Sequence, residues 1–185
     1  MGRLSYAAIA SLDGYIADES GSFEWAFPSA EVHAVMNDLE RPVGTNLLGR
    51  RMYEVMLAWE TWDVEGEPPE VQDFASLWHA SDKIVYSRTL DTVASERTRI
   101  ERDFDPDAIR ALKWSAARDL SIGGADLAGQ ALSAGLVDDL HLVITPVVVG
   151  GGTRALPDGV RLDLDLQAER TFDNGFAYLH YRVRT

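Results

Sequence analysis

The sequence predicts an α/β domain in which a mainly parallel central sheet is flanked by helices and bordered by an antiparallel C-terminal edge hairpin. Strand-like and helix-like segments alternate along the chain, which is the pattern of consecutive βαβ units. The last two strand-like segments follow one another without a helix, which indicates the hairpin. The 185 residues contain no internal repeat or linker, so we expect one domain over residues 1–185.

Each expected element rests on a local signal. We expect strands at residues 3–10, 45–48, 83–87, 119–122, 139–149, 160–171 and 176–183. We expect helices at residues 29–39, 50–57, 71–79, 105–118 and 125–134. Ser29 can cap a helix, Pro106 suits a first helical turn, and Gly135 can end a helix. The acidic segment 59–73 is expected to be a turn-rich loop in which Pro68-Pro69 forbids a helix, and residues 92–102 are polar without an expected element.

Composition excludes several classes of protein. The net charge of −13 argues against general nucleic-acid binding, which needs a basic surface. The absence of cysteine excludes disulfides and thiolate chemistry, and the four histidines lack metal-ligand spacing, so no metal site is expected. No segment approaches the roughly 20 apolar residues of a membrane span, and the first residues lack the features of a signal peptide. We therefore expect a cytoplasmic protein without a membrane partner.

Three expected strands end in residues that suit an anion. Gly49-Arg50-Arg51 opens a helix, whose free N–H groups and guanidinium forks can bind phosphate. Ser87-Arg88 offers a hydroxyl and a cation at a second strand end, and Gly123-Gly124 would let backbone N–H groups approach a third ligand group closely. Each has an alternative, which is a glycine turn with solvated arginines, an ordinary strand end and a tight turn, respectively. The last motif is neither a Rossmann fingerprint nor a P-loop.

The three strand ends favour one joint interpretation. Ligands of open α/β sheets bind beyond the carboxyl ends of the strands. Two arginine-bearing strand ends and a glycine pair therefore suggest a ligand with several phosphates, such as a dinucleotide that carries an additional 2′-phosphate.

The chain resembles the dihydrofolate reductase-like superfamily, and within it the branch of the riboflavin-biosynthesis reductase domain (RibD C-terminal-like). The resemblance lies in the order and spacing of pieces that span nearly the full length, none of them specific alone. These pieces are SLDGYIA, TNLLGRRMYE, KIVYSRTL, LSIGGADLAGQAL and DDLHLVITPVVVGGGTRAL.

The resemblance implies that the chain binds NADPH. Gly49, Arg50 and Arg51 would face its phosphates, and Ser87 and Arg88 would hold the 2′-phosphate. The glycine pair, which the superfamily usually joins by a cis peptide, would receive the pyrophosphate. The other residues that would line the cofactor are Ala8, Ile16 and Ala17 around the nicotinamide, and Ile122, Gly123, Gly124, Ala125 and Asp126 around the pyrophosphate.

The resemblance also implies a substrate side. Asp13 and Glu31 are the candidate catalytic carboxylates, although Asp13 could simply form the turn before Gly14, and Glu31 could simply favour a helix N-terminus. Trp25 could close over the substrate or anchor its loop. Thr153 and Arg154 resemble the branch's substrate-side loop, and Arg154 could bind a substrate phosphate.

These implications predict an NADPH-dependent oxidoreductase that transfers a hydride to a C=N or C=O of a small polar heterocycle. The expected type is a 5-amino-6-(5-phosphoribosylamino)uracil reductase, and Asp13, Glu31 or a water would supply the proton. The alternatives are a dihydrofolate reductase and a non-catalytic NADPH-binding or dimeric scaffold module. The branch implies a homodimer.

Overall fold

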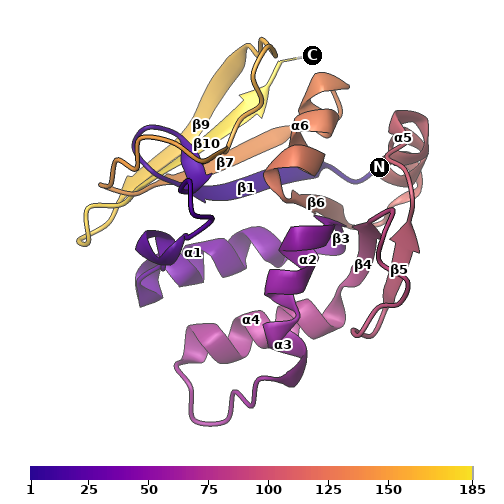
Figure 1. Cartoon of the computed structure of the whole chain (residues 1–185), viewed down its shortest axis with the longest axis horizontal. Helices are drawn as coiled ribbons and strands as arrows, with labels where there is room; N and C mark the ends of the chain where they lie inside the picture. Colours follow the sequence, from indigo (N-terminus) through magenta and orange to yellow (C-terminus); the bar gives the residue numbers. More distant parts are fainter. Residues whose placement is uncertain (185) are drawn as a thin grey trace.

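The computed structural model, which describes residues 1–184, confirms the α/β class (Figure 1). In these residues, eight strands form one sheet in the order β5-β4-β3-β6-β1-β7-β10-β9. The first six in this order run parallel, and β10 and β9 form the expected antiparallel hairpin at the edge. The bounds are β1 Leu4–Ala10, β3 Val43–Gly49, β4 Asp82–Tyr86, β5 Thr98–Glu101, β6 Asp119–Gly123, β7 Asp139–Ile144, β9 Leu164–Thr171 and β10 Ala177–Val183.

Helices cover both faces of the sheet (Figure 1). Their bounds are η1 Glu24–Ala26, α1 Ala30–Glu40, α2 Arg50–Met56, α3 Ala58–Thr61, α4 Pro69–Ala80, α5 Pro106–Ser115 and α6 Ala125–Ser133. Leu47 and Leu120 pack with α5 and α6 on one face, whereas Leu48 packs with α2 and α4 on the other. Because side chains alternate along a strand, the buried Asn46 and Ser121 also point to the α2 and α4 side. This second face is therefore partly polar.

Several element predictions were wrong at their boundaries or missed an element. Pro69 begins α4, because a first-turn proline lacks an N–H that the helix does not need there. β7 ends at Ile144, two residues before Pro146, which cannot donate to a ladder. β9 starts at Leu164 rather than at residue 160. The polar segment 98–101 is strand β5, because pairing with β4 outweighs its weak strand propensity.

Two short strands, absent from the sequence-based expectation, connect distant loops. β2 (Tyr15–Ala17) pairs antiparallel with β8 (Thr153–Arg154). α3, another unexpected element, occupies the start of the acidic segment that was expected to be a loop. Within residues 1–184, no helix is both long and apolar enough to cross a membrane.

Candidate functional site

The three anion-suited motifs lie side by side at one edge of the sheet. In the register of the parallel strands, Gly49 of β3 stands next to Tyr86 of β4, and Leu48 stands next to Gly123 of β6. Parallel strands place their carboxyl ends at the same edge, so the residues that follow β3, β4 and β6 meet there. We call these three neighbouring strand ends, with residues 49–51, 87–90 and 123–126, the strand-end edge.

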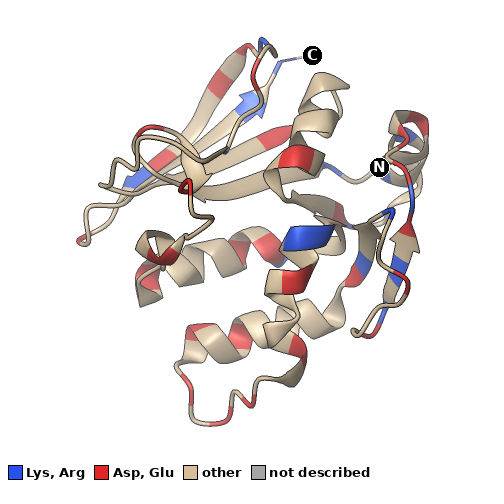
Figure 2. Cartoon of the chain, in the orientation of Figure 1, with Lys and Arg blue, Asp and Glu red and all other residues tan. Residues whose placement is uncertain are grey.

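Arginine connects two of these motifs directly. Arg50 begins α2 and donates from Nη1 to Oγ1 of Thr89, in the turn after β4, while its Nε donates to Glu54. Arg51 is exposed, and Figure 2 shows the first turn of α2 in the colour of basic residues. Two guanidinium groups therefore stand where a phosphate could reach them.

The turn after β4 is built around Ser87. Its Oγ accepts from the backbone N–H groups of Thr89 and Leu90, at 3.3 and 3.0 Å. Arg102, which follows β5, donates from Nη1 to the carbonyl oxygens of Ser87 and Leu90, at 2.9 and 2.7 Å. Sequence reasoning missed Arg102 because it missed β5; a recognised strand at 98–101 would have revealed a fourth strand end with an arginine.

Arg88 lies on the same turn but points into solvent. Its side chain is 81% exposed and pairs with Asp103 at 2.7 Å, which is itself exposed. An exposed ion pair of this kind contributes at most about 1 kcal/mol, so a phosphate could replace Asp103 at small cost.

The glycine pair joins β6 to α6 and lies beside Gly49 of β3. Gly124 has φ +97°, and a Cβ at this position would lie 3.7 Å from the backbone of Gly49. Gly124 is also the N-cap of α6 and offers no capping side chain, so the first N–H groups of the helix remain open to a ligand. All peptide bonds of the described chain are trans, so the expected cis peptide is absent and the positive φ of Gly124 makes the turn instead.

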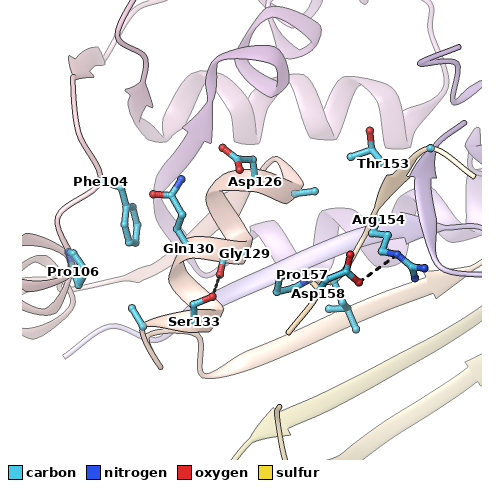
Figure 3. Close-up of a pocket in the computed structure, with 14 residues that line it drawn as sticks. Phe104, Pro106, Asp126, Gly129, Gln130, Ser133, Thr153, Arg154, Pro157 and Asp158 are labelled. Carbon is cyan, nitrogen blue, oxygen red and sulfur yellow. Dashed lines mark hydrogen bonds and ion pairs between the residues drawn. The ribbon is translucent and has the colours of Figure 1, made fainter. Parts of the chain in front are cut away.

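A cavity of about 850 Å³ spans the exposed side of α6 (Figure 3). It is lined by Ala125, Asp126 and Gln130 of α6 and by Thr153 and Arg154 of β8. The structure therefore brings predicted cofactor residues and predicted substrate residues to one cavity. The carboxylate of Asp126 adds a negative charge in the first turn of α6, which favours the helix but opposes an anion there.

Asp13 holds the glycine-rich loop that precedes β8. Its carboxylate accepts from the Ser11 hydroxyl at 2.7 Å and from the backbone N–H groups of Val149 and Gly150 at 3.2 and 2.8 Å. The hydrogen bond from Ser11, and then those from Gly150 and Val149, hold the pKa of Asp13 below its usual value. Asp13 is therefore an ionised loop anchor in this arrangement, which leaves no proton on it to donate near neutral pH.

The pairing of β2 with β8 positions Arg154. The Arg154 guanidinium lies 5.1 Å from the centre of the Tyr15 ring, and its Nε lies 3.5 Å from Oδ1 of Asp158. Gly152 packs so tightly that a Cβ would lie 2.1 Å from the Ala17 carbonyl oxygen. The motifs SLDGYIA and GGGTRAL are thus two halves of one structural unit.

The remaining predicted residues divide between this unit, the core and the outer surface. Ala8 is buried on β1, and Ile122 is buried on β6. Ile16 and Ala17 are half-buried on β2. Trp25 lies in η1, and its buried Nε1 has no hydrogen-bond partner among residues 1–184.

Glu31 lies apart from these groups. Its carboxylate forms an exposed ion pair with Arg170 of β9, and it lines neither of the two cavities described here. The helix register turns it toward the hairpin rather than toward the sheet interior, so the structure does not bring it together with Asp13 or with the strand-end edge.

A second cavity, of about 140 Å³, lies between α1, α2, α4 and the partly polar face of the sheet. Glu40, the last residue of α1, lines it together with Asn46 and Ser121. Sequence reasoning did not single out Glu40. The available signal was its position at i+8 from Val32 and i+4 from Met36, which places a carboxyl group on the apolar stripe of the helix.

Comparisons with known proteins agree with this geometry. The YyaP protein of Bacillus subtilis is 28% identical over 174 residues, which are 92% of this chain and 89% of that protein. A structure from Shewanella sp. PV-4, ascribed to riboflavin biosynthesis, aligns with a TM-score of 0.78 at 19% identity and covers 99% of both chains. Dihydrofolate reductase from Enterococcus faecalis, solved with NADP(H), aligns with a TM-score of 0.64 at 16% identity, over 100% of this chain and 98% of that one.

The likeness to these structures shows a dihydrofolate reductase-like fold. Residues 3–178 match the RibD C-terminal domain family, which is the branch that the sequence motifs indicated. That match extends over nearly the whole chain and includes the strand-end edge and the β2–β8 unit. The chain therefore belongs to the RibD C-terminal domain family, a family of oxidoreductases.

Proposed function

We propose that the protein is an NADPH-dependent reductase that transfers a hydride to a C=N or C=O carbon of a small polar heterocycle. The proposed type is a 5-amino-6-(5-phosphoribosylamino)uracil reductase. The observation that carries the proposal is that Arg50, Ser87, Arg88 and Gly124 meet at one edge of the sheet. The chain also belongs to a family of reductases. The structural neighbour solved with NADP(H) supports the choice of cofactor.

The residues of the strand-end edge fit a dinucleotide phosphate. The glycine N-cap of α6 leaves backbone N–H groups free for a pyrophosphate, and Gly124 has no side chain that would stand in its way. Arg88 and the neighbouring Arg50 offer guanidinium forks for the 2′-phosphate, which NADH lacks. Ala8, Ile16 and Ala17 would border the nicotinamide, from which bound NADPH supplies the hydride.

The substrate side is proposed to be the unit of β2 and β8. The Asp13 carboxylate would hold the glycine-rich loop in place, and Arg154 would bind a substrate phosphate from that loop. Because Asp13 is ionised and Glu31 lies in an outer ion pair, a water is the better of the three earlier candidates for supplying the proton.

The experiment is a reductase assay on the purified protein. NADPH oxidation is followed spectrophotometrically while pyrimidine ribosylamine phosphates, dihydrofolate and small carbonyl compounds are offered in turn. We expect turnover with the ribosylamine phosphate, and none without an acceptor. Turnover with dihydrofolate alone would instead identify a folate reductase, an outcome that the likeness to the Enterococcus enzyme makes worth including.

The same assay, combined with a measurement of NADPH binding, distinguishes an enzyme from a non-catalytic protein. Tight NADPH binding without turnover on any acceptor would favour a scaffold, whereas no NADPH binding would overturn the proposal. The homodimer that the branch implies is proposed as well, and light scattering of the purified chain measures it directly.

A further inference from the structure

The cavity of about 140 Å³ has soft apolar walls. Met36 of α1 and Met52 and Met56 of α2 line it, which are three of the four methionines of the chain. Phe74 and Trp78 of α4 complete the wall opposite the sheet. Thioether side chains adapt their shape and contact aromatic rings favourably, so these walls suit a flat ring.

The floor of the cavity is polar and its hydrogen bonds run in one direction. Ser121 donates from Oγ to Oδ1 of Asn46, and Asn46 donates from Nδ2 to Oγ of Ser81 at 2.8 Å. Ser81 in turn donates to the Trp78 carbonyl oxygen at 3.0 Å. The Glu40 carboxyl group lies at the end of this chain of hydrogen bonds, beside the Ser121 hydroxyl.

Glu40 occupies a position that costs stability. It ends α1, where the helix dipole disfavours a carboxylate, and no ion pair within residues 1–184 includes it. Burial raises the pKa of Glu40 to about 7, and its hydrogen bond with Ser121 offsets only part of this. The residue lines the cavity and is half-buried as a whole. Ionisable groups that line a cavity and have a shifted pKa often belong to binding sites.

The wall that closes the cavity is held firmly in place. Asn37 of α1 donates from Nδ2 to the Glu70 carbonyl oxygen and to Asp73 of α4, each at 2.8 Å. Trp78 donates from Nε1 to Glu60 at 2.7 Å, and the Lys83 ammonium lies 4.4 Å from its ring centre. The cavity is therefore a preformed space rather than a loose gap between helices.

On the basis of the proposed reductase function, we infer that this cavity is the seat of the substrate's six-membered ring, an amino-substituted pyrimidine whose N–H groups bind Glu40. The ring would lie between the methionines and the sheet, and Asn46 and Ser121 would meet its other polar atoms. Glu40 thereby becomes the residue that selects the ring, a role assigned to neither Asp13 nor Glu31.

Size and chemistry both favour this class of ligand. An apolar cavity of about 150 Å³ holds one benzene ring, so the present volume admits a single ring and excludes a fused ring system with its substituents. Gly123 and Leu48 line the same cavity and belong to the strands that end at the strand-end edge. A benzene-like ring without N–H groups would leave Glu40 unpaired.

The test observes the methionine methyl groups of the full chain by NMR during titration with 5,6-diaminouracil. We expect the signals of Met36, Met52 and Met56 to shift together, while Met1, which is 80% exposed, stays unchanged as the internal reference. Benzene is titrated as a ring without N–H groups and should bind more weakly. An absence of shifts at these three methionines with every ring would overturn the inference.

The variant Glu40→Gln keeps the side-chain volume and removes the charge. We expect it to weaken 5,6-diaminouracil binding about tenfold, the effect of losing one charge-assisted hydrogen bond. The matched control is Asp38→Asn, on the exposed side of the same helix, which should leave the ring affinity unchanged. Equal affinities of wild type and Glu40→Gln would contradict the role of Glu40.

NADPH affinity is measured on the same samples. Ring binding at the methionines without NADPH binding would refute the proposed function and leave a pyrimidine-binding cavity. NADPH binding without methionine shifts would refute the cavity inference and leave the reductase proposal intact.

Discussion

The strand-end edge and the Glu40 cavity are built in opposite ways. At the edge, charges are exposed and form ion pairs that a ligand could replace, as in the Arg88–Asp103 pair. In the cavity, the walls are buried and the carboxyl group of Glu40 has no cationic partner within residues 1–184. A solvated edge can exchange its own ion pairs for phosphates at little cost, whereas a buried polar group requires a ligand that matches it.

This difference indicates that the two regions have different roles in ligand binding. The edge would supply affinity for any ligand with the right phosphates, and the cavity would supply selectivity for the ring that it admits. Because the two regions use different interactions, changes in one should leave ligand binding in the other largely intact. The following predictions test that independence.

The largest effect is expected from Gly124→Ala. A side chain at φ +97° strains the backbone by about 1–2 kcal/mol, and it adds a methyl group at the N-cap of α6, where the pyrophosphate would bind, so NADPH affinity should fall more than tenfold. Gly135→Ala is the matched control, because its φ of +63° brings similar strain away from the edge. Denaturant unfolding and an NADPH titration measure the two effects. Equal loss of NADPH affinity in both variants would contradict a cofactor role for Gly124.

The second prediction concerns the cavity and pH. The folded-state pKa of Glu40 is raised from 4.5 to about 7, so the folded state keeps a proton that the unfolded chain releases. Stability from this group is therefore present below pH 4.5 and lost as the pH rises to about 7. Glu40→Gln should abolish that loss and gain roughly 3 kcal/mol over wild type at pH 8 relative to pH 4. If the free energies of unfolding of wild type and Glu40→Gln differ by the same amount at every pH, the prediction is contradicted.

The third prediction separates the edge from the cavity through the 2′-phosphate. Arg88→Ala should weaken NADPH at least tenfold and NADH little, because only NADPH carries the phosphate that the guanidinium would bind. Arg99→Ala, another exposed arginine of this side of the sheet, serves as the control. Calorimetry with both cofactors gives the ratio, and equal weakening of NADPH and NADH would remove Arg88 from the 2′-phosphate.

The smallest effect is expected at Asp126. Removing its negative charge from the first turn of α6 in Asp126→Asn should tighten NADPH about twofold to fivefold at low salt, since the helix N-terminus then faces the pyrophosphate without a competing carboxylate. High salt should screen most of the gain. If Asp126→Asn instead weakens NADPH binding, the Asp126 carboxylate stabilises the complex, for example by accepting a hydrogen bond from a ribose hydroxyl.

The sequence was sufficient for the fold and for most of the strand-end edge. Once the strands were recognised as parallel, the residues after β3, β4 and β6 had to meet at one edge, so Arg50, Arg88 and Gly124 could be placed without coordinates. Arg102 could not, because the polar strand β5 exists only through its pairing with β4.

The interior groups depended on contacts between distant segments. Asp13 binds N–H groups 136 and 137 residues away, so its role as a loop anchor was not visible in the motif. Glu31 and Glu40 lie on one helix, and the helical period separates their directions, but only the packing of α4 makes a closed cavity at Glu40. The ion pair of Glu31 likewise requires Arg170 from a strand near the end of the chain.

The central claim is that the strand-end edge binds NADPH through its 2′-phosphate. Isothermal titration of the purified protein with NADPH and with NADH, under one buffer condition, tests it most directly. We predict saturable NADPH binding that is at least tenfold tighter than NADH binding, as expected for one charge-assisted phosphate contact. Absence of NADPH binding, or equal affinity for the two cofactors, would contradict the account.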